Sequence, residues 1–149
     1  MASYSHTQPG TLLRISLVVP AVAMLASSAF VSPKERTIFI AVATTLVLAL
    51  ALFHSLCTSI DANYLRLRFG VGLISFKYRL TDITDAIPVK IKWYDGWGIR
   101  VLRNGLLFNV SGLDAVEIRF SSGSIRRIGT NEPSALTQAV NDAIHGHCA

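Results

Sequence analysis

The stretch LALALFHSLCTSIDANYLRLRFG, residues 48–70, contains the point at which the chain changes character. Its first part lacks Lys, Arg, Asp and Glu, whereas Leu65, Leu67 and Phe69 in its last part alternate with polar or charged residues. Alternation with a period of two predicts a strand buried on one side, because successive side chains point to opposite faces of a sheet. The sequence therefore predicts an apolar N-terminal region that joins a sheet-containing domain near Asp61.

Charge is distributed unevenly along the 149 residues, of which 51% are hydrophobic and 15% are charged. The charged residues before Asp61 are Arg14, Lys34, Glu35 and Arg36. A helix needs roughly 20 apolar residues to cross the hydrocarbon core of a bilayer. We therefore expect an N-terminal tail over residues 1–11 and two transmembrane helices over about 12–32 and 37–60, which form a hairpin.

The first apolar segment also allows a second interpretation. Arg14, the apolar run after it and the small residues 26–29 resemble a secretory signal peptide with its cleavage site. The run is long for the apolar part of a signal peptide, which favours an uncleaved helix. Both interpretations place residues 61–149 on the same side of the membrane.

Basic residues near the ends of the two spans predict the orientation. The loop between the spans offers Lys34 and Arg36. Five basic residues flank the membrane on the side shared by the N-terminus and the domain: Arg14, Arg66, Arg68, Lys77 and Arg79. Because Lys and Arg accumulate on the cytoplasmic side, we expect a multi-pass protein of the cytoplasmic (inner) membrane, with the N-terminus and residues 61–149 in the cytoplasm. Cys57 and Cys148 are poor disulfide partners and do not indicate an oxidising compartment.

Seven short strands and one helix are predicted after Asp61. Alternation and turn signals place the strands at residues 64–69, 74–80, 89–93, 97–102, 106–110, 116–120 and 125–130. A helix is predicted to begin at Pro133 and to stop at Gly146, with apolar residues at helical spacing between them. This pattern indicates a seven-stranded antiparallel sandwich or barrel capped by a C-terminal helix.

Several short motifs lie between residues 93 and 133. They are GWGIR at 96–100, NVSG at 109–112, RIGT at 127–130 and Glu132-Pro133. With the two apolar segments, they resemble a family of bacterial membrane proteins that carry two N-terminal spans and a PH-like (pleckstrin-homology) domain of the bacterial type. The resemblance implies an α+β, mainly-β PH-like domain over residues 61–149, but no reaction and no catalytic residues. The motif residues that carry it are Trp93, Gly96, Trp97, Gly98, Arg100, Gly112 and Gly129.

Both tryptophans of the chain lie in KWYDGWGIR, residues 92–100. Alternation places Trp93 on the face of Val89 and Ile91, and Trp97 on the face of Ile99 and Val101. Both indoles are therefore expected to point toward the core and to hold the sandwich together. The alternative is a position at the membrane interface, where tryptophan is enriched.

Candidate catalytic and metal-binding residues are few. Asp114 and Glu117 lie three apart on a predicted strand, so they point to opposite faces, and Asp82 and Asp85 share that spacing. The tail sequence His-Gly-His-Cys, residues 145–148, offers metal ligands but has no second pair elsewhere. We therefore expect no enzymatic activity, no metal and no cofactor.

Positive charge is concentrated in the first half of the domain. Residues 61–103 contain eight Lys or Arg against four Asp, whereas residues 104–149 contain three against four Asp or Glu. Each basic residue close to an anionic membrane surface is worth about 1 kcal/mol. The candidate lipid-surface contacts are Arg66, Arg68, Lys77, Arg79, Lys90 and Lys92.

These patterns favour a membrane-anchored PH-like binding or scaffold module that recruits a protein partner at the cytoplasmic face of the membrane. The expected partners are the lipid bilayer and either an unknown protein or a second copy of the chain. The alternative is a regulatory subunit that responds to anionic lipid through Arg66, Arg68, Lys77 and Arg79. No nucleic-acid partner is expected, because the basic face carries no motif of a nucleic-acid-binding protein.

Overall fold

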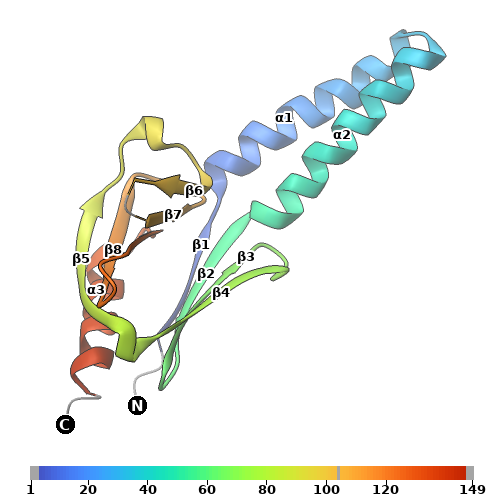
Figure 1. Cartoon of the computed structure of the whole chain (residues 1–149). Coiled ribbons are helices and arrows are strands. Elements are labelled where there is room, and N and C mark those ends of the chain that lie inside the picture. The colour runs from blue at the N-terminus through green and yellow to red at the C-terminus, as the bar shows by residue number, and fades with distance from the viewer. Residues whose placement is uncertain (1–3, 104, 147–149) are drawn as a thin grey trace.

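Two long helices project from one end of a two-sheet β-sandwich (Figure 1). The structure, a computed structural model, describes residues 4–103 and 105–146. Helix α1 covers Thr11–Ser27 and continues as the 3-10 turn η1, Ser28–Phe30; helix α2 covers Pro33–Phe53. Both helical segments are long and apolar enough to cross a membrane. We call the end of the sandwich from which they leave the helix end.

The two helices form a hairpin with a tight polar turn. Glu35 accepts hydrogen bonds from the backbone N–H of Ser32 at 3.1 Å and from its hydroxyl at 2.7 Å, which caps the start of α2. Ala21 of α1 and Ala43 of α2 are buried, while most of the larger side chains on the helices are exposed. Small residues between helices allow close packing, and large apolar residues facing outward suit a lipid environment.

Two strands that the sequence pattern does not predict flank the helices directly. Strand β1 covers Tyr4–Pro9 and strand β2 covers Ser55–Ile60, and the two pair as antiparallel neighbours. The predicted second span, 37–60, is therefore too long at its C-terminal end, and the predicted tail, 1–11, contains a strand. In β2, Leu56, Thr58 and Ile60 are buried at every second position, as expected of a strand.

The first sheet contains β1, β2, β3 (Tyr64–Phe69) and β4 (Ile74–Arg79), in this order and with antiparallel pairing throughout. The second sheet has the order β5-β8-β9-β7-β6. Its strands are β5 (Ile83–Lys90), β6 (Gly98–Leu102), β7 (Gly105–Asn109), β8 (Asp114–Phe120) and β9 (Ile125–Gly129). Strands β7 and β9 are parallel, and the other pairs are antiparallel. Two short 3-10 turns complete the chain, η2 (Leu80–Asp82) and η3 (Trp93–Asp95).

The described residues thus form nine strands in two sheets and no closed barrel, rather than a single seven-stranded unit. Six of the seven predicted strands correspond to β3, β4 and β6–β9, whereas the predicted strand 89–93 overlaps β5 only at Val89 and Lys90; β1 and β2 are additional. The predicted C-terminal helix is confirmed as α3, Pro133–His145, which ends at Gly146. The mainly-β class with a terminal helix is therefore correct, whereas the strand count and the single barrel are not.

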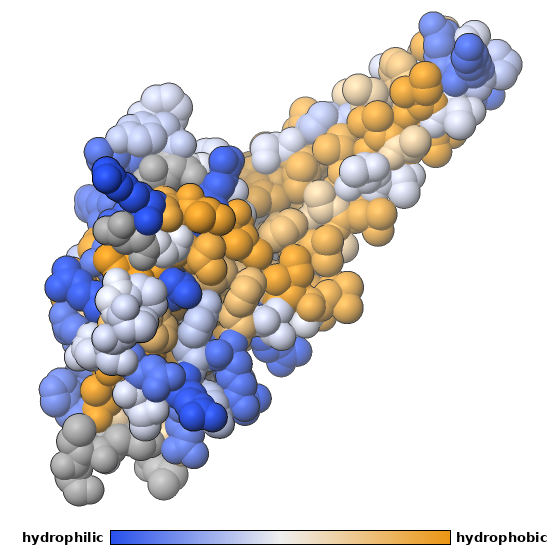
Figure 2. All heavy atoms as spheres, in the orientation of Figure 1, coloured by the Kyte–Doolittle hydropathy of each residue, from blue (hydrophilic) through white to orange (hydrophobic). Residues whose placement is uncertain are grey.

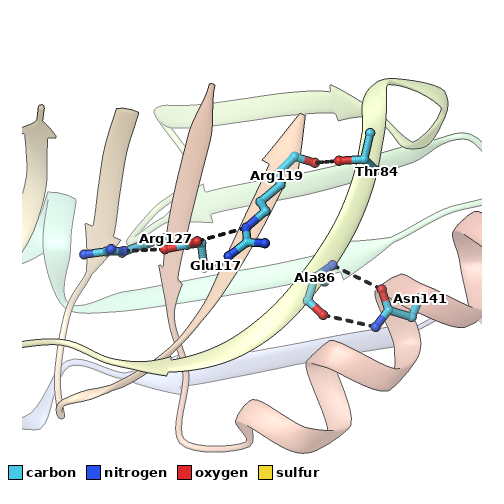
Figure 3. Close-up of polar contacts among 6 residues, drawn as sticks. All are labelled: Thr84, Ala86, Glu117, Arg119, Arg127 and Asn141. Carbon is cyan, nitrogen blue, oxygen red and sulfur yellow. Dashed lines mark hydrogen bonds and ion pairs between the residues drawn. The ribbon is translucent and has the colours of Figure 1, made fainter. Parts of the chain in front are cut away.

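The main core lies between the two sheets. Phe69 of the first sheet and Phe108 of the second are fully buried, with their ring centroids 6.1 Å apart. Leu136 and Val140 of α3 join this core, because α3 packs against β5, β8 and β2. The Asn141 side chain donates to the carbonyl of Ala86 at 3.1 Å and accepts from its N–H at 3.2 Å (Figure 3). Helix α3 therefore covers one open side of the sandwich and pairs backbone groups at the β5 edge.

Gly70 couples the β3–β4 turn to the end of α2. Its N–H donates to the carbonyl of Ser55 at 2.8 Å, its φ is 47°, and an added Cβ would overlap the carbonyl oxygens of Ala51 and Leu52. Gly123, in the β8–β9 turn, also has a positive φ, 79°, but an added Cβ there would meet nothing.

We predict that Gly70→Ala lowers the free energy of unfolding by more than about 3 kcal/mol. The new Cβ strains the backbone at a positive φ and also displaces the last turn of α2. Gly123→Ala should cost only about 1–2 kcal/mol, which is the left-handed strain alone. Chemical denaturation of the full chain in detergent, followed by near-ultraviolet circular dichroism, measures both losses. Equal losses for the two variants would show that the β3–β4 turn is not packed on α2.

Candidate functional site

Four of the predicted basic contacts share one face. Arg66 and Arg68 lie on β3, and Lys77 and Arg79 lie on β4, where all four are exposed on the outer face of the first sheet. Arg66 and Lys77 are direct cross-strand partners. The structure therefore brings these four side chains to one face, and their contact with lipid stays a prediction.

Two of these four cations have partners within the chain. The Arg66 Nε lies 2.8 Å from a carboxylate oxygen of Asp61, and the Lys77 Nζ lies 3.6 Å from the ring centroid of Tyr64. An anionic headgroup that bound Arg66 or Lys77 would compete with these contacts. The outer face of the first sheet is thus a partly compensated basic surface rather than an open anion site.

Distance from the helices separates the four residues further. Arg68 is one residue from the end of β3 that meets α2, whereas Tyr64 and its partner Arg79 lie five residues from that end. A strand rises about 3.4 Å per residue, so Arg79 lies roughly 17 Å from the helix end. That distance is about twice the Debye length of about 8 Å at physiological ionic strength. The structure therefore places Arg68 nearest the helices and Arg79 farthest from them.

Lys90 and Lys92 belong to a different part of the surface. Lys90 ends β5 in the second sheet, and the Lys92 Nζ lies 5.4 Å from the ring centroid of Tyr94 in the connection that follows. The six candidate lipid contacts are therefore divided between the outer face of the first sheet, with four, and the end of β5 with the connection after it, with two.

Both tryptophans lie on the surface, so the prediction that they point toward the core is wrong. Trp93 is 76% exposed and Trp97 is 40% exposed. The alternation of Val89 and Ile91 does not extend to them, since β5 ends at Lys90 and the chain then forms η3. Gly96 has a φ of 73° and turns the chain between the two indoles, and Gly98, directly after Trp97, has a φ of 96°.

Other motif residues have structural roles. Gly129 of β9 packs so closely on Asn109 that an added Cβ would overlap the Asn109 side chain. Asn109 is buried, donates to the Gly112 carbonyl at 3.2 Å and accepts from the Ser111 N–H at 3.2 Å. These contacts hold the β7–β8 loop, in which Gly112 has a φ of 76°. Arg100 is exposed on β6, with its guanidinium against Gly96.

A buried carboxylate on the second sheet was not identified from the sequence. Glu117 of β8 has a side chain that is only 7% exposed, and it accepts hydrogen bonds from Arg127 Nε at 3.0 Å and Arg119 Nε at 3.2 Å (Figure 3). Glu117 and Arg127 are direct partners across β8 and β9. Only the strand register reveals the pair, because ten residues separate them in the sequence.

A depression lies beside this ion pair on the outer face of the second sheet. Its volume is about 260 Å³, and its lining residues are Leu102, Arg103, Gly105, Ile125 and Arg127. Strand β6 forms the adjacent edge of the sheet, where Val101 is 84% exposed. Arg127 is already paired with Glu117, so Arg103 next to the apolar side chains is the cation that suits an acidic group carried by a partly apolar ligand.

Among residues 4–103 and 105–146, no group of three or more His, Cys, Asp or Glu is placed to hold a metal ion. His147 and Cys148 of the tail motif lie outside the described residues. His54 caps the end of α2, and Cys57 lies in β2 rather than in a span. Burial raises the pKa of the Tyr78 hydroxyl, a rise that Arg126 partly offsets, so this phenol stays protonated at neutral pH and packs in the core.

No protein-family model matches the chain, and no curated protein matches its sequence. The function is therefore argued from the geometry of the surfaces described above.

We predict that Glu117→Ala lowers the free energy of unfolding by about 2–3 kcal/mol, because Arg127 and Arg119 lose their shared buried partner. The matched control is Asp61→Ala, which removes a carboxylate from an exposed ion pair and should cost less than about 1 kcal/mol. Denaturant titration of the full chain in detergent measures both values. A cost for Glu117→Ala no larger than the control would show that the carboxylate does not order the second sheet.

Proposed function

We propose that the chain is a membrane-anchored PH-like module that recruits a protein partner at the cytoplasmic face of the cytoplasmic membrane. In this proposal α1 and α2 cross the bilayer as a hairpin, and the sandwich lies in the cytoplasm. This orientation is supported by the distribution of basic residues. Arg14 and the arginines of β3 lie on the side of the sandwich, and the turn between the helices offers only Lys34 and Arg36.

The observation that carries the proposal is the insertion of the helical hairpin between two paired strands. One residue, Gly10, separates β1 from α1, and one residue, His54, separates α2 from β2. The Gly10 N–H donates to the His54 carbonyl at 2.8 Å, and the Arg14 Nε donates to the same oxygen at 3.1 Å. A module joined to its anchor without a linker presents the same surfaces to its partner at a fixed orientation.

The PH-like assignment draws support from the order of elements. Strands β3–β9 followed by α3 match the seven strands and terminal helix that the motif resemblance implies. The motif residues Asn109 and Gly129 are buried against each other, and Asn109 also bonds the carbonyl of exposed Gly112, as residues that maintain a fold would.

The contacts and positions of the basic residues on the first sheet favour protein recruitment over a lipid-responsive regulatory role. Arg66 and Lys77 already have partners, and Arg79 lies far from the helix end. The second sheet instead offers the β6 edge, with exposed Val101 and the arginine-lined depression beside it. A partner segment that adds a strand to β6 and places an acidic side chain near Arg103 fits this surface, whereas Arg127 is already paired with Glu117.

Orientation is tested by labelling cysteine variants in intact cells with a membrane-impermeant thiol reagent. In a background with Cys57→Ser and Cys148→Ser, Lys34→Cys should react from outside, and Ser122→Cys in the β8–β9 turn should react only after the membrane is broken. Labelling of Ser122→Cys in intact cells, with Lys34→Cys protected, would refute the cytoplasmic placement.

Recruitment is tested by a photoreactive amino acid placed at Val101 or, as a control, at Ser122. The full chain must be used, because a fragment that begins at residue 61 lacks β1 and β2, half of the first sheet. We expect a discrete protein adduct in cells from position 101 alone, which Arg103→Glu weakens severalfold. Equal adducts from both positions, or none from position 101, would contradict recruitment at β6.

A further inference from the structure

The exposed apolar side chains of the sandwich are not scattered. Among the described residues outside the two helices, seven large apolar or aromatic side chains are exposed, and six of them lie in three loops. We call these six the apolar rim: Val71, Leu73, Trp93, Tyr94, Trp97 and Leu113. The seventh, Val101, lies on β6. Large exposed apolar groups that gather in one region mark a contact surface.

The β3–β4 turn places the first two rim residues beside the last turn of α2. The N–H of Val71 donates to the carbonyl of Ala51 at 3.3 Å, and Gly70 is bonded to Ser55 just after the helix. Leu73, two residues from Val71, is 79% exposed. The tip of this hairpin therefore lies level with the end of a helix that is long enough to span a membrane.

The other rim residues are connected to the same end of the sandwich. The Gln8 side chain, three residues before the start of α1, donates to the Ser111 carbonyl in the β7–β8 loop at 2.7 Å. In that loop the Leu113 carbonyl accepts from the N–H of Ile91 at 2.7 Å, which fixes the start of the β5–β6 connection there. Figure 1 shows this connection at the helix end, away from the C-terminus of α3.

The surface of the helices continues into this region. Figure 2 shows hydrophobic surface along both helices that extends onto the adjoining end of the sandwich, whereas hydrophilic residues dominate the opposite end. Cations accompany the rim: Arg14 lies in the first turn of α1, Arg68 lies against Gly72 of the β3–β4 turn, and Lys92 lies near Tyr94. Aromatic and aliphatic side chains flanked by cations match the boundary between acyl chains and anionic headgroups.

We propose that the apolar rim is seated in the interfacial layer of the same bilayer that holds α1 and α2. The occupant of this surface is phospholipid, with acyl-chain ends against Val71 and Leu73, and with headgroups at the level of Trp93, Trp97 and Arg68. The sandwich then rests on the membrane at points around the helix pair, rather than extending freely from it. This inference rests on the proposed function, because it requires the helices to be in the bilayer.

The test uses the two tryptophans, since both lie in the rim and the chain has no others. The full chain is reconstituted into vesicles whose lipids carry bromine atoms on the upper part of the acyl chains, which quench indoles by contact. We expect the tryptophan emission to fall at least about twofold relative to vesicles without bromine, and iodide in the water to quench weakly. Tryptophan emission that is the same with and without brominated lipid, and that iodide quenches fully, would overturn the inference.

A matched pair of variants tests the role of the hairpin tip. Val71→Ser combined with Leu73→Ser should reduce the quenching by brominated lipid, because the rim loses its aliphatic contacts. Val101→Ser, an exposed position on β6 outside the rim, should leave the quenching unchanged. Equal effects of the two changes on the quenching would contradict the placement of the rim in the interfacial layer of the bilayer.

A second tryptophan position separates failure of this inference from failure of the proposed function. In a chain with Trp93→Phe and Trp97→Phe, Val42→Trp places an indole on the exposed face of α2. Quenching of this indole by lipids brominated deep in the acyl chains shows that the helices are inserted. Quenching at position 42 without quenching of the native tryptophans overturns the seated rim alone, whereas no quenching at position 42 refutes the membrane anchor itself.

Discussion

The pairing of β1 with β2 is the constraint on which the rest of the structure depends. The two strands are aligned from Pro9 opposite Ser55 to Tyr4 opposite Ile60, although 45 residues of helical hairpin and turns separate Pro9 from Ser55. The pairing brings the start of α1 and the end of α2 to adjacent points, where Gly10 and His54 bond directly. It also completes the first sheet, whose buried residues Leu56 and Ile60 belong to the main core. The helices and the sandwich are thus parts of one folding unit.

The same constraint determines which surfaces lie near the helices. Because β2 continues into β3 and the β3–β4 turn packs back on α2, Val71 and Arg68 are held beside the helix pair. The outer face of the second sheet, with Glu117 and the depression beside Arg127, belongs to strands farther along the chain. A lipid-facing rim and a partner-binding edge on different parts of one rigid unit would let the protein dock on the bilayer and bind a partner at the same time.

Alternation and turn signals predicted β3, β4, β6–β9 and α3, because each has a polar face and a buried face of its own, but they placed the strand between β4 and β6 too late, at 89–93 instead of Ile83–Lys90. Strand β2 was missed since its residues Leu56 and Ile60 extend an uncharged run that begins in the helix, so hydropathy does not mark the boundary. Strand β1, with Pro9 and mostly polar residues, is a strand because of its partner rather than its propensity. Trp93 was assigned to the core by extending the β5 pattern beyond Lys90, where the strand ends. Glu117 and its arginines required the strand register, which local sequence does not contain.

The most direct test of the account is the register of β1 against β2 in the intact protein. Thr7 lies opposite Cys57, and directly opposed residues in antiparallel strands have Cα atoms about 4.5–5.5 Å apart, within reach of a disulfide. In a chain with Cys148→Ser, mild oxidation of Thr7→Cys should give an intramolecular disulfide with Cys57, detected by mass spectrometry after proteolysis. Ser5→Cys, which lies opposite Ser59, should remain reduced. A disulfide from Ser5→Cys, or none from Thr7→Cys, would contradict the claim that the sandwich and the helical hairpin are joined through this pair of strands.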